Sequence, residues 1–180
     1  MTAALSTGVI GVNVDRVTAG TTTDGALSEF KLGTEVVGAD GNVYRYVQAG
    51  AAISTATTEP YALAIDENEQ AVKLTSALAL VGHRIGFAPR QIIADNAFFW
   101  ARMRGTFPIR VAASVAADAL LGMISTDTAG RLAAAPTTAS AGNAVVMNVM
   151  IVTAASASAS AGNTIRTAIV NYPFGKLKGN

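Results

Sequence analysis

Few residues in this chain have the types and spacing that chemistry requires. His83 is the only histidine, and the chain contains no cysteine. A serine hydrolase would have to use His83 as its base, yet no Gly-x-Ser-x-Gly nucleophile turn is present. The composition also excludes metal sites built on two histidines or on cysteines. We interpret His83 as a polar residue beside a turn, and we predict no catalytic residue.

Carboxylates gather at Asp66, Glu67 and Glu69. Oxygen ligands at this spacing could bind a hard cation, but such a run is more typical of a charged hairpin tip, and we predict no metal site. The glycine-rich segments lack the Gly-Lys-Ser/Thr ending of a phosphate-binding loop. The sequence therefore predicts a protein that is not an enzyme and that holds no cofactor.

The stretch GTEVVGADGNVYRYVQAG, residues 33–50, is typical of two β-strands joined by a turn. Runs of valine and tyrosine lie on both sides of Asp40-Gly41, a pair that favours a tight turn. Nothing nearby supplies a base, a nucleophile or a set of metal ligands, so we interpret the pair as the turn of a plain hairpin. The stretch STDTAGRLAAA, residues 125–135, repeats this pattern loosely, with its turn at Asp127 to Gly130.

Short strands separated by turn residues make up most of the chain. Residues 61–65 and 72–74 predict a hairpin, and one or two helical turns are expected before Gly82. Further strands are expected at 85–88, 98–104, 109–111, 120–125, 145–152 and 164–174. Gly105 should break or bulge one strand, Pro108 should mark an edge or a strand start, and Pro173 should end the last strand.

This spacing predicts an all-β fold, either a β-barrel or a β-sandwich of short antiparallel strands with little helix. The 36 alanines are the main objection, because alanine is depleted in strands. Residues 1–30 are rich in threonine and glycine without a helical period. We interpret them as an extended N-terminal arm that orders against another surface, with a frayed terminus as the alternative. Residues 31–180 form the β-rich domain.

The charge distribution favours an assembled protein. Charged residues make up 14 % of the chain, against about 25 % in a typical soluble domain. Residues 1–70 hold nine acidic and three basic residues, whereas residues 71–180 hold three acidic and ten basic residues. These halves could neutralise each other within one domain, or the acidic half of one copy could meet the basic half of another.

Other partners and locations are less well supported. The net charge of +1 lacks the basic excess of a nucleic-acid-binding protein, and we predict no nucleic-acid partner. We also predict no membrane partner, since the sequence has no run of about 20 apolar residues that could span one. The N-terminus lacks the basic start and the apolar block of a secretory signal peptide. We therefore expect synthesis in a cytoplasm.

One predicted strand combines aromatic and basic residues. Phe98, Trp100, Arg102 and Arg104 occupy alternate positions, so all four side chains would lie on one face of the strand. Aromatic residues and arginine are enriched at interface hot spots, and we predict that this face contacts another protein. The aromatic side chains could instead belong to the core.

Four stretches, taken in order, carry a resemblance to a known family. They are LGTEVVGADGNVYRYVQAGAAIS, VGHRIGFAPRQIIADNAFFWARMRG, LLGMISTDTAGRLAAA and TAIVNYPF. Their order and spacing between Gly33 and Phe174, about four-fifths of the chain, resemble the head decoration, or cement, proteins of tailed bacteriophages. Similar phage proteins show a Tyr-Arg-Tyr hairpin, an Asp-Asn turn before a tryptophan-containing strand, an Ala-Gly-Arg turn and an aromatic-Pro-Phe strand.

The resemblance implies a virion protein on the outer surface of a phage capsid, commonly a homotrimer, that stabilises contacts between adjacent major capsid proteins. The family has no catalytic residues to carry over. An arm that reaches along the capsid or into a neighbouring subunit would suit residues 1–30. A phage tail or fibre-associated structural protein is the alternative. A carbohydrate-binding β-sandwich is a further rival, although it would require a row of exposed aromatic residues.

Overall fold

The computed structural model describes residues 12–20, 28–53, 60–112, 115–124, 126–135, 137, 142–152 and 164–177. Its elements, in chain order, are β1 (Glu35–Val37), β2 (Val43–Ala49), β3 (Ala62–Ile65), β4 (Gln70–Lys73), α1 (Ser76–Leu80), β5 (Arg84–Phe87), β6 (Phe98–Val111), β7 (Leu121–Met123), β8 (Ala133–Ala134), β9 (Ala144–Ile151) and β10 (Thr164–Leu177). The predicted all-β fold is confirmed, and the expected hairpin (β3 and β4) and the short helix before Gly82 are both present.

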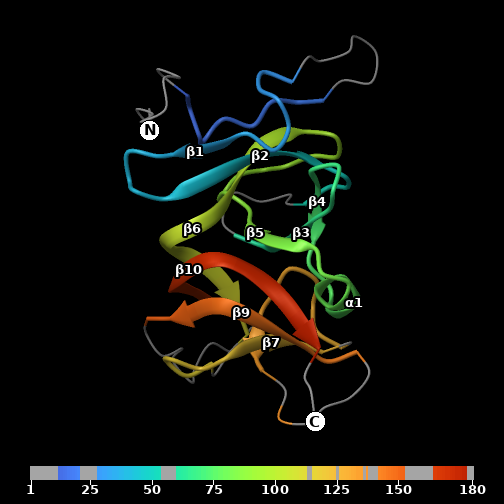
Figure 1. Ribbon diagram of the computed structural model, residues 1–180, viewed down its shortest axis with the longest axis vertical. Coiled ribbons are helices and arrows are strands. Elements are labelled where there is room, and N and C mark those ends of the chain that lie inside the picture. The colour runs from blue at the N-terminus through green and yellow to red at the C-terminus, as the bar shows by residue number, and fades with distance from the viewer. Residues whose placement is uncertain are drawn as a thin grey trace.

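Five strands close into a ring. Their order is β2-β4-β3-β5-β6, and β6 pairs back with β2 to complete a small barrel. The pairings are antiparallel except between β2 and β4, which run parallel. β1 pairs with β2 on the outside of this ring. The other four strands extend from the barrel as a sheet in the order β6-β10-β9-β7-β8. The structure thus joins a barrel to a sheet, with β7 and β9 at the opposite end of the molecule from β1 and β2 (Figure 1).

The barrel interior explains why alanine is compatible with these strands. An eight-stranded barrel is just wide enough for side chains to fill it, so a ring of five strands has room for fewer large ones. The core inside the ring combines Val47, Leu63, Ile65, Phe99 and Met103 with the small residues Ala49, Ala71, Ala88 and Ala101. A Cβ atom on Gly86 of β5 would lie 3.0 Å from both Ile65 Cδ1 and Met103 Sδ. Alanine and glycine therefore fit where strands approach across a narrow interior.

A second core lies between the barrel and the attached sheet. It is formed by side chains of β3, β5, β6, β7, β9 and β10 together with Leu74 and Ala79. All four residues of β3 are buried, because one face of the strand lines the barrel and the other contributes to this second core. Thr75 caps α1, since its hydroxyl accepts a hydrogen bond from the backbone N of Leu78 at 3.3 Å.

β6 connects the barrel to the sheet as one continuous strand of 14 residues. It pairs with β2 through residues 98–104 and with β10 through residues 104–111. The predicted break at Gly105 does not occur, although the register against β2 shifts at Met103 and Gly105 has a φ of 132°. Pro108 lies inside the strand, so the expectation of a strand start is wrong. The expectation of an edge is met locally, because Pro108 is paired with β10 on one side and the pairings of β6 with β2 and β5 end before it.

β10 also continues past the proline that was expected to end it. The register against β9 shifts between Val170 and Phe174, and Tyr172 has a φ of 45°. A bulge tolerates proline because residues within it are not required to donate a ladder hydrogen bond. The prediction that Pro173 ends the strand is therefore wrong, and the bulge is the reason.

Candidate interaction surface

The structure separates the four residues that the sequence predicts as an interface. Phe98, Trp100, Arg102 and Arg104 share the outer face of β6, which we define as its alternate residues from 98 to 108. The residues between them point into the two cores. Phe98 and Trp100 are only 8 % and 2 % exposed, whereas Arg102 is half-buried and Arg104 is exposed. The two aromatic residues therefore lie in the core, and Arg104 is the one fully at the surface.

Phe98 and Trp100 belong to a third core on the outside of the barrel, where they meet side chains of β2. The Trp100 ring lies 4.9 Å from the ring of Tyr46 and 5.2 Å from that of Phe30. Phe30 also meets Tyr46 edge-on at 5.3 Å. Aromatic pairs at such distances contribute about 0.5–1.5 kcal/mol each beyond the burial of area. Trp100 thus anchors the chain before β1 to the barrel wall.

Residues 12–20 and 28–32 cover this aromatic cluster. They come mostly from residues 1–30, the segment predicted as an extended arm. Val12 and Val14 are buried within the third core, and Figure 1 shows the segment crossing β2 on the side away from β3 and β5. We call residues 12–20 and 28–32 the cover.

Hydrogen bonds and an ion pair hold the cover in register. The backbone N of Thr18 donates to Phe98 O at 2.9 Å, and Phe98 N donates back to Thr18 O at 2.8 Å. Arg16 and Glu29 form an ion pair at 2.9 Å that joins the two pieces of the cover. The described part of the predicted arm therefore contacts its own domain, and residues 1–11 and 21–27 lie outside the described residues.

Arg102 is engaged within its own chain. It lies opposite Tyr44 in the register of β2 and β6, and its Cζ is 5.6 Å from the ring centroid of Phe107.

The hydroxyl of Tyr44 donates to Asp40 Oδ2 at 2.5 Å. Burial, followed by this hydrogen bond to a carboxylate, raises the pKa of Tyr44 to about 12. Burial also acts to raise the pKa of Asp40, but hydrogen bonds from Tyr44 and Asn42 outweigh it and lower that pKa.

Gly105 lies where the outer face of β6 changes from covered to uncovered. A Cβ atom on Gly105 would lie 1.7 Å from Asn42 Oδ1. That oxygen accepts a hydrogen bond from the backbone N of Thr106 at 3.0 Å, and Asn42 Nδ2 donates to Asp40 Oδ2 at 2.7 Å. The turn between β1 and β2 therefore contacts β6 at the point where the pairing partner of β6 changes from β2 to β10.

Beyond Gly105, the outer face of the sheet carries apolar side chains that the described residues leave open to solvent. Ile169 of β10 is paired with Met150 of β9 on one side and with Thr106 of β6 on the other. Ile169, Met150 and Val152 are 44 %, 42 % and 45 % exposed. An antiparallel sheet with a solvated side normally shows polar residues there. We call Thr106, Met150, Val152, Thr167, Ile169 and Asn171 the uncovered face.

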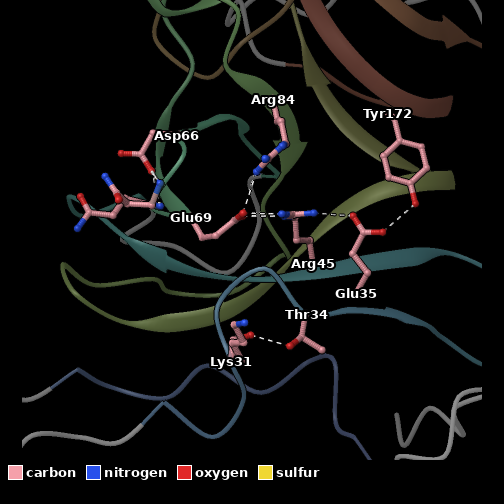
Figure 2. Close-up of polar contacts among 10 residues, drawn as sticks. Lys31, Thr34, Glu35, Arg45, Asp66, Glu69, Arg84 and Tyr172 are labelled. Atoms are coloured by element: carbon pink, nitrogen blue, oxygen red, sulfur yellow. Dashed lines mark hydrogen bonds and ion pairs between the residues drawn. The ribbon is translucent and has the colours of Figure 1, made fainter.

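A network of charged groups, which sequence reasoning missed, ties the barrel to β10 (Figure 2). The carboxylate of Glu69 accepts from Arg45 Nε at 2.7 Å and from Arg84 Nη1 at 2.8 Å, and it also bonds Arg45 Nη2. Arg45 Nη1 reaches Glu35 Oε1 at 2.9 Å, and the Tyr172 hydroxyl donates to Glu35 Oε2 at 3.1 Å. Hydrogen bonds from Arg45 come first among the causes that lower the pKa of Glu69, against the opposing effect of burial. No pattern along the sequence links these five residues.

The acidic run considered as a cation site has structural roles instead. Asp66 Oδ1 accepts from the backbone N of Asn68 at 2.9 Å and of Gln70 at 2.8 Å, which closes the turn before β4. Glu69 points to the arginines, as described above. Among the described residues, no group of three or more His, Asp or Glu side chains could hold a metal ion. His83 lines a small depression with Asp66 and Gln70.

The described residues contain no helix long and apolar enough to cross a membrane. A scan against models of known protein families finds no match, and a search of curated proteins finds no significant relative.

Proposed function

We propose that this chain is a structural virion protein that binds the outside of a phage capsid as a homotrimer and stabilises contacts between major capsid proteins. The observation that carries the proposal is the uncovered face, where Met150, Val152 and Ile169 are exposed on a domain that already has three hydrophobic cores. Adjacent exposed apolar side chains mark contact sites for other proteins.

The four stretches that resemble decoration proteins supply the framework of this surface. The first stretch forms the β1–β2 hairpin, and the second runs through β5 into β6. The third contains β7 and β8, and the fourth begins within β10 and ends at the bulge with Pro173. Their shared residues therefore serve turns, bulges and pairing in the fold, which is the role we expect in a protein that works by shape.

The mechanism is passive. A rigid body presents a fixed surface, and each contact it makes on a shell is repeated over many copies, so modest contacts add through multivalency. The aromatic cluster under the cover and the network around Glu69 hold this body together. No proton transfer and no bound cofactor enters this role.

The test is to mix the purified chain with isolated capsid shells of the phage whose genome encodes it, after removal of the native copy. We expect the chain to sediment with the shells at a saturating ratio and to raise the temperature at which they rupture. A chain that stays in the supernatant at every ratio would contradict the proposal. Sedimentation with purified tails instead would favour the alternative, a tail or fibre-associated structural protein.

A further inference from the structure

Two exposed residues of opposite charge lie at the two borders of the β10–β9 strand pair. Arg104 is exposed at the β6 border, where it is paired with Asn171 of β10. Asp118 is exposed beyond β9, where its backbone N donates to Ile151 O at 3.1 Å. Within the part of the chain that the structure describes, neither side chain forms a hydrogen bond or an ion pair.

These two charges cannot neutralise each other within one copy. Arg104 is paired with Asn171 of β10, whereas Ile151, which accepts the bond from Asp118, is paired with Ala168. Three strand spacings of about 4.8 Å across the sheet and three residues of about 3.4 Å along it therefore place the two backbones about 18 Å apart. A second copy of the chain carries the same apolar residues and both charges, so it is complementary to the face in both respects. That match favours a second copy over a foreign protein as the occupant.

We propose that the uncovered face is the contact between copies of this chain, with Arg104 of one copy pairing with Asp118 of the next. Met150, Val152 and Ile169 pack between the copies. Apolar burial stabilises such a contact by about 25 cal/mol per Å², whereas the ion pair fixes its register. A homotrimer requires this contact to be head-to-tail, with the ring closed by a threefold rotation, whereas an isologous contact of the same residues would give a dimer. The inference rests on the homotrimer of the proposed function and assigns its interface.

Disulfide trapping tests this assignment directly, because the chain has no cysteine of its own. The variant with Arg104→Cys and Asp118→Cys is oxidised and resolved by denaturing electrophoresis. A disulfide requires Cα atoms within about 7 Å, so the separation of about 18 Å prevents a bond within one copy. We expect covalent oligomers that end at the trimer in the double variant and none in either single variant.

Two results would overturn the interface. One is the absence of covalent oligomers from the double variant, and the other is efficient cross-linking of a single variant, which would place identical borders together. A product that ends at the dimer would support the contact and overturn the trimer. A trapped trimer that ignores capsids would contradict the proposed function and leave this interface standing.

A second measurement covers the case in which the cysteine variants fold poorly. Ile169→Glu places a charge in the centre of the face, and Val81→Glu is its control, because Val81 is 68 % exposed and lies outside the face. Light scattering should give a monomer mass for Ile169→Glu and the wild-type oligomer mass for Val81→Glu. Equal masses for the two variants would overturn the proposal, as would a wild-type monomer whose capsid binding is lost with Ile169→Glu.

Discussion

The outer face of β6 consists of two halves that differ in what lies over them. On one half, Phe98 and Trp100 are buried under residues 12–20 and 28–32 of the same chain. On the other half, Thr106 borders Ile169, which remains 44 % exposed. One strand thus continues from a surface that the chain covers by itself to a surface that the described residues leave open.

This difference in exposure suggests separate roles for the two halves, one in folding and one in the proposed contact between copies. The covered half closes a core with aromatic pairs and backbone hydrogen bonds, so its residues stabilise the single copy. The open half contributes less to that stability, because its apolar side chains remain more than 40 % exposed. Mutations should therefore separate the two halves, with large effects on unfolding from the first and small effects from the second.

The largest effect is expected from Trp100→Ala, which empties the centre of the covered half. Removing a buried tryptophan costs about 3–5 kcal/mol of unfolding free energy, and Trp100 is only 2 % exposed. Denaturant titration followed by far-UV circular dichroism measures the loss. Phe174→Ala is the matched control, since Phe174 is an aromatic residue 45 % exposed. Equal losses for the two variants would contradict the division into halves.

Gly105→Ala is expected to be the next most damaging change, at the boundary of the two halves. The added Cβ would meet Asn42 Oδ1 at 1.7 Å and would hold a φ of 132°. Backbone strain and the loss of the Asn42 hydrogen bond together cost about 2–4 kcal/mol. Gly82→Ala has a φ of 82° and no atom within 4 Å, so its thermal denaturation should reveal a smaller loss, of about 1–2 kcal/mol. Equal melting temperatures for Gly105→Ala and Gly82→Ala would contradict the need for glycine at position 105.

Glu69→Gln is expected to loosen the charged network that links β2 with β5 and reaches β10 through Arg45 and Glu35. The carboxylate receives charged hydrogen bonds from Arg45 and Arg84, and their weakening costs about 2 kcal/mol. Glu67→Gln, an exposed position in the same turn, is the control and should cost less than about 0.5 kcal/mol.

The same link gives a pH dependence with a defined sign. The pKa of Glu69 is lowered from 4.5 in the folded chain, with hydrogen bonds from Arg45 as the first cause. A carboxyl with a depressed folded pKa stabilises the fold fully above its unfolded pKa, and that stabilisation is lost as the pH falls through the folded value. Unfolding measured from pH 6 to pH 2 should therefore show an acid loss that is smaller in Glu69→Gln. Parallel curves for the two proteins would contradict the network.

The smallest effect on folding is expected from Ile169→Thr in the open half. The change keeps a β-branched residue on a strand and removes apolar surface that is already 44 % exposed. The unfolding free energy of the single copy should change by less than about 0.5 kcal/mol. The oligomer should nevertheless dissociate at a higher protein concentration, which analytical ultracentrifugation measures. A large loss of folding stability, or an unchanged oligomer, would show that Ile169 does not belong to an open interface.

Local patterns in the sequence predicted the strands and turns well. The turn at Asp40-Gly41 is confirmed by hydrogen bonds from Gly38 N to Asn42 O and from Gly41 N to Gly38 O. The strand ends were less predictable, because a bulge can absorb a residue that would otherwise stop a strand. Pro173 lies in such a bulge, and its position depends on the register of β9 beside it.

The alternation of residues along β6 predicts which side chains share a face of the strand. It does not predict which other segments cover that face. Phe98, Trp100 and Arg104 do share one side of β6, but residues distant in sequence cover the first two. The uncovered face escaped prediction because its apolar residues come from β9 and β10, and their juxtaposition depends on strand pairing. The Glu69 network was missed for the same reason.

A cryo-electron-microscopy map of the intact particle tests the central claim most directly. We expect the barrel and its sheet on the outside of the shell, in groups of three copies whose β6–β10–β9 faces meet one another. Particles that lack the chain would contradict the claim, as would bound copies whose Ile169, Met150 and Val152 face open solvent.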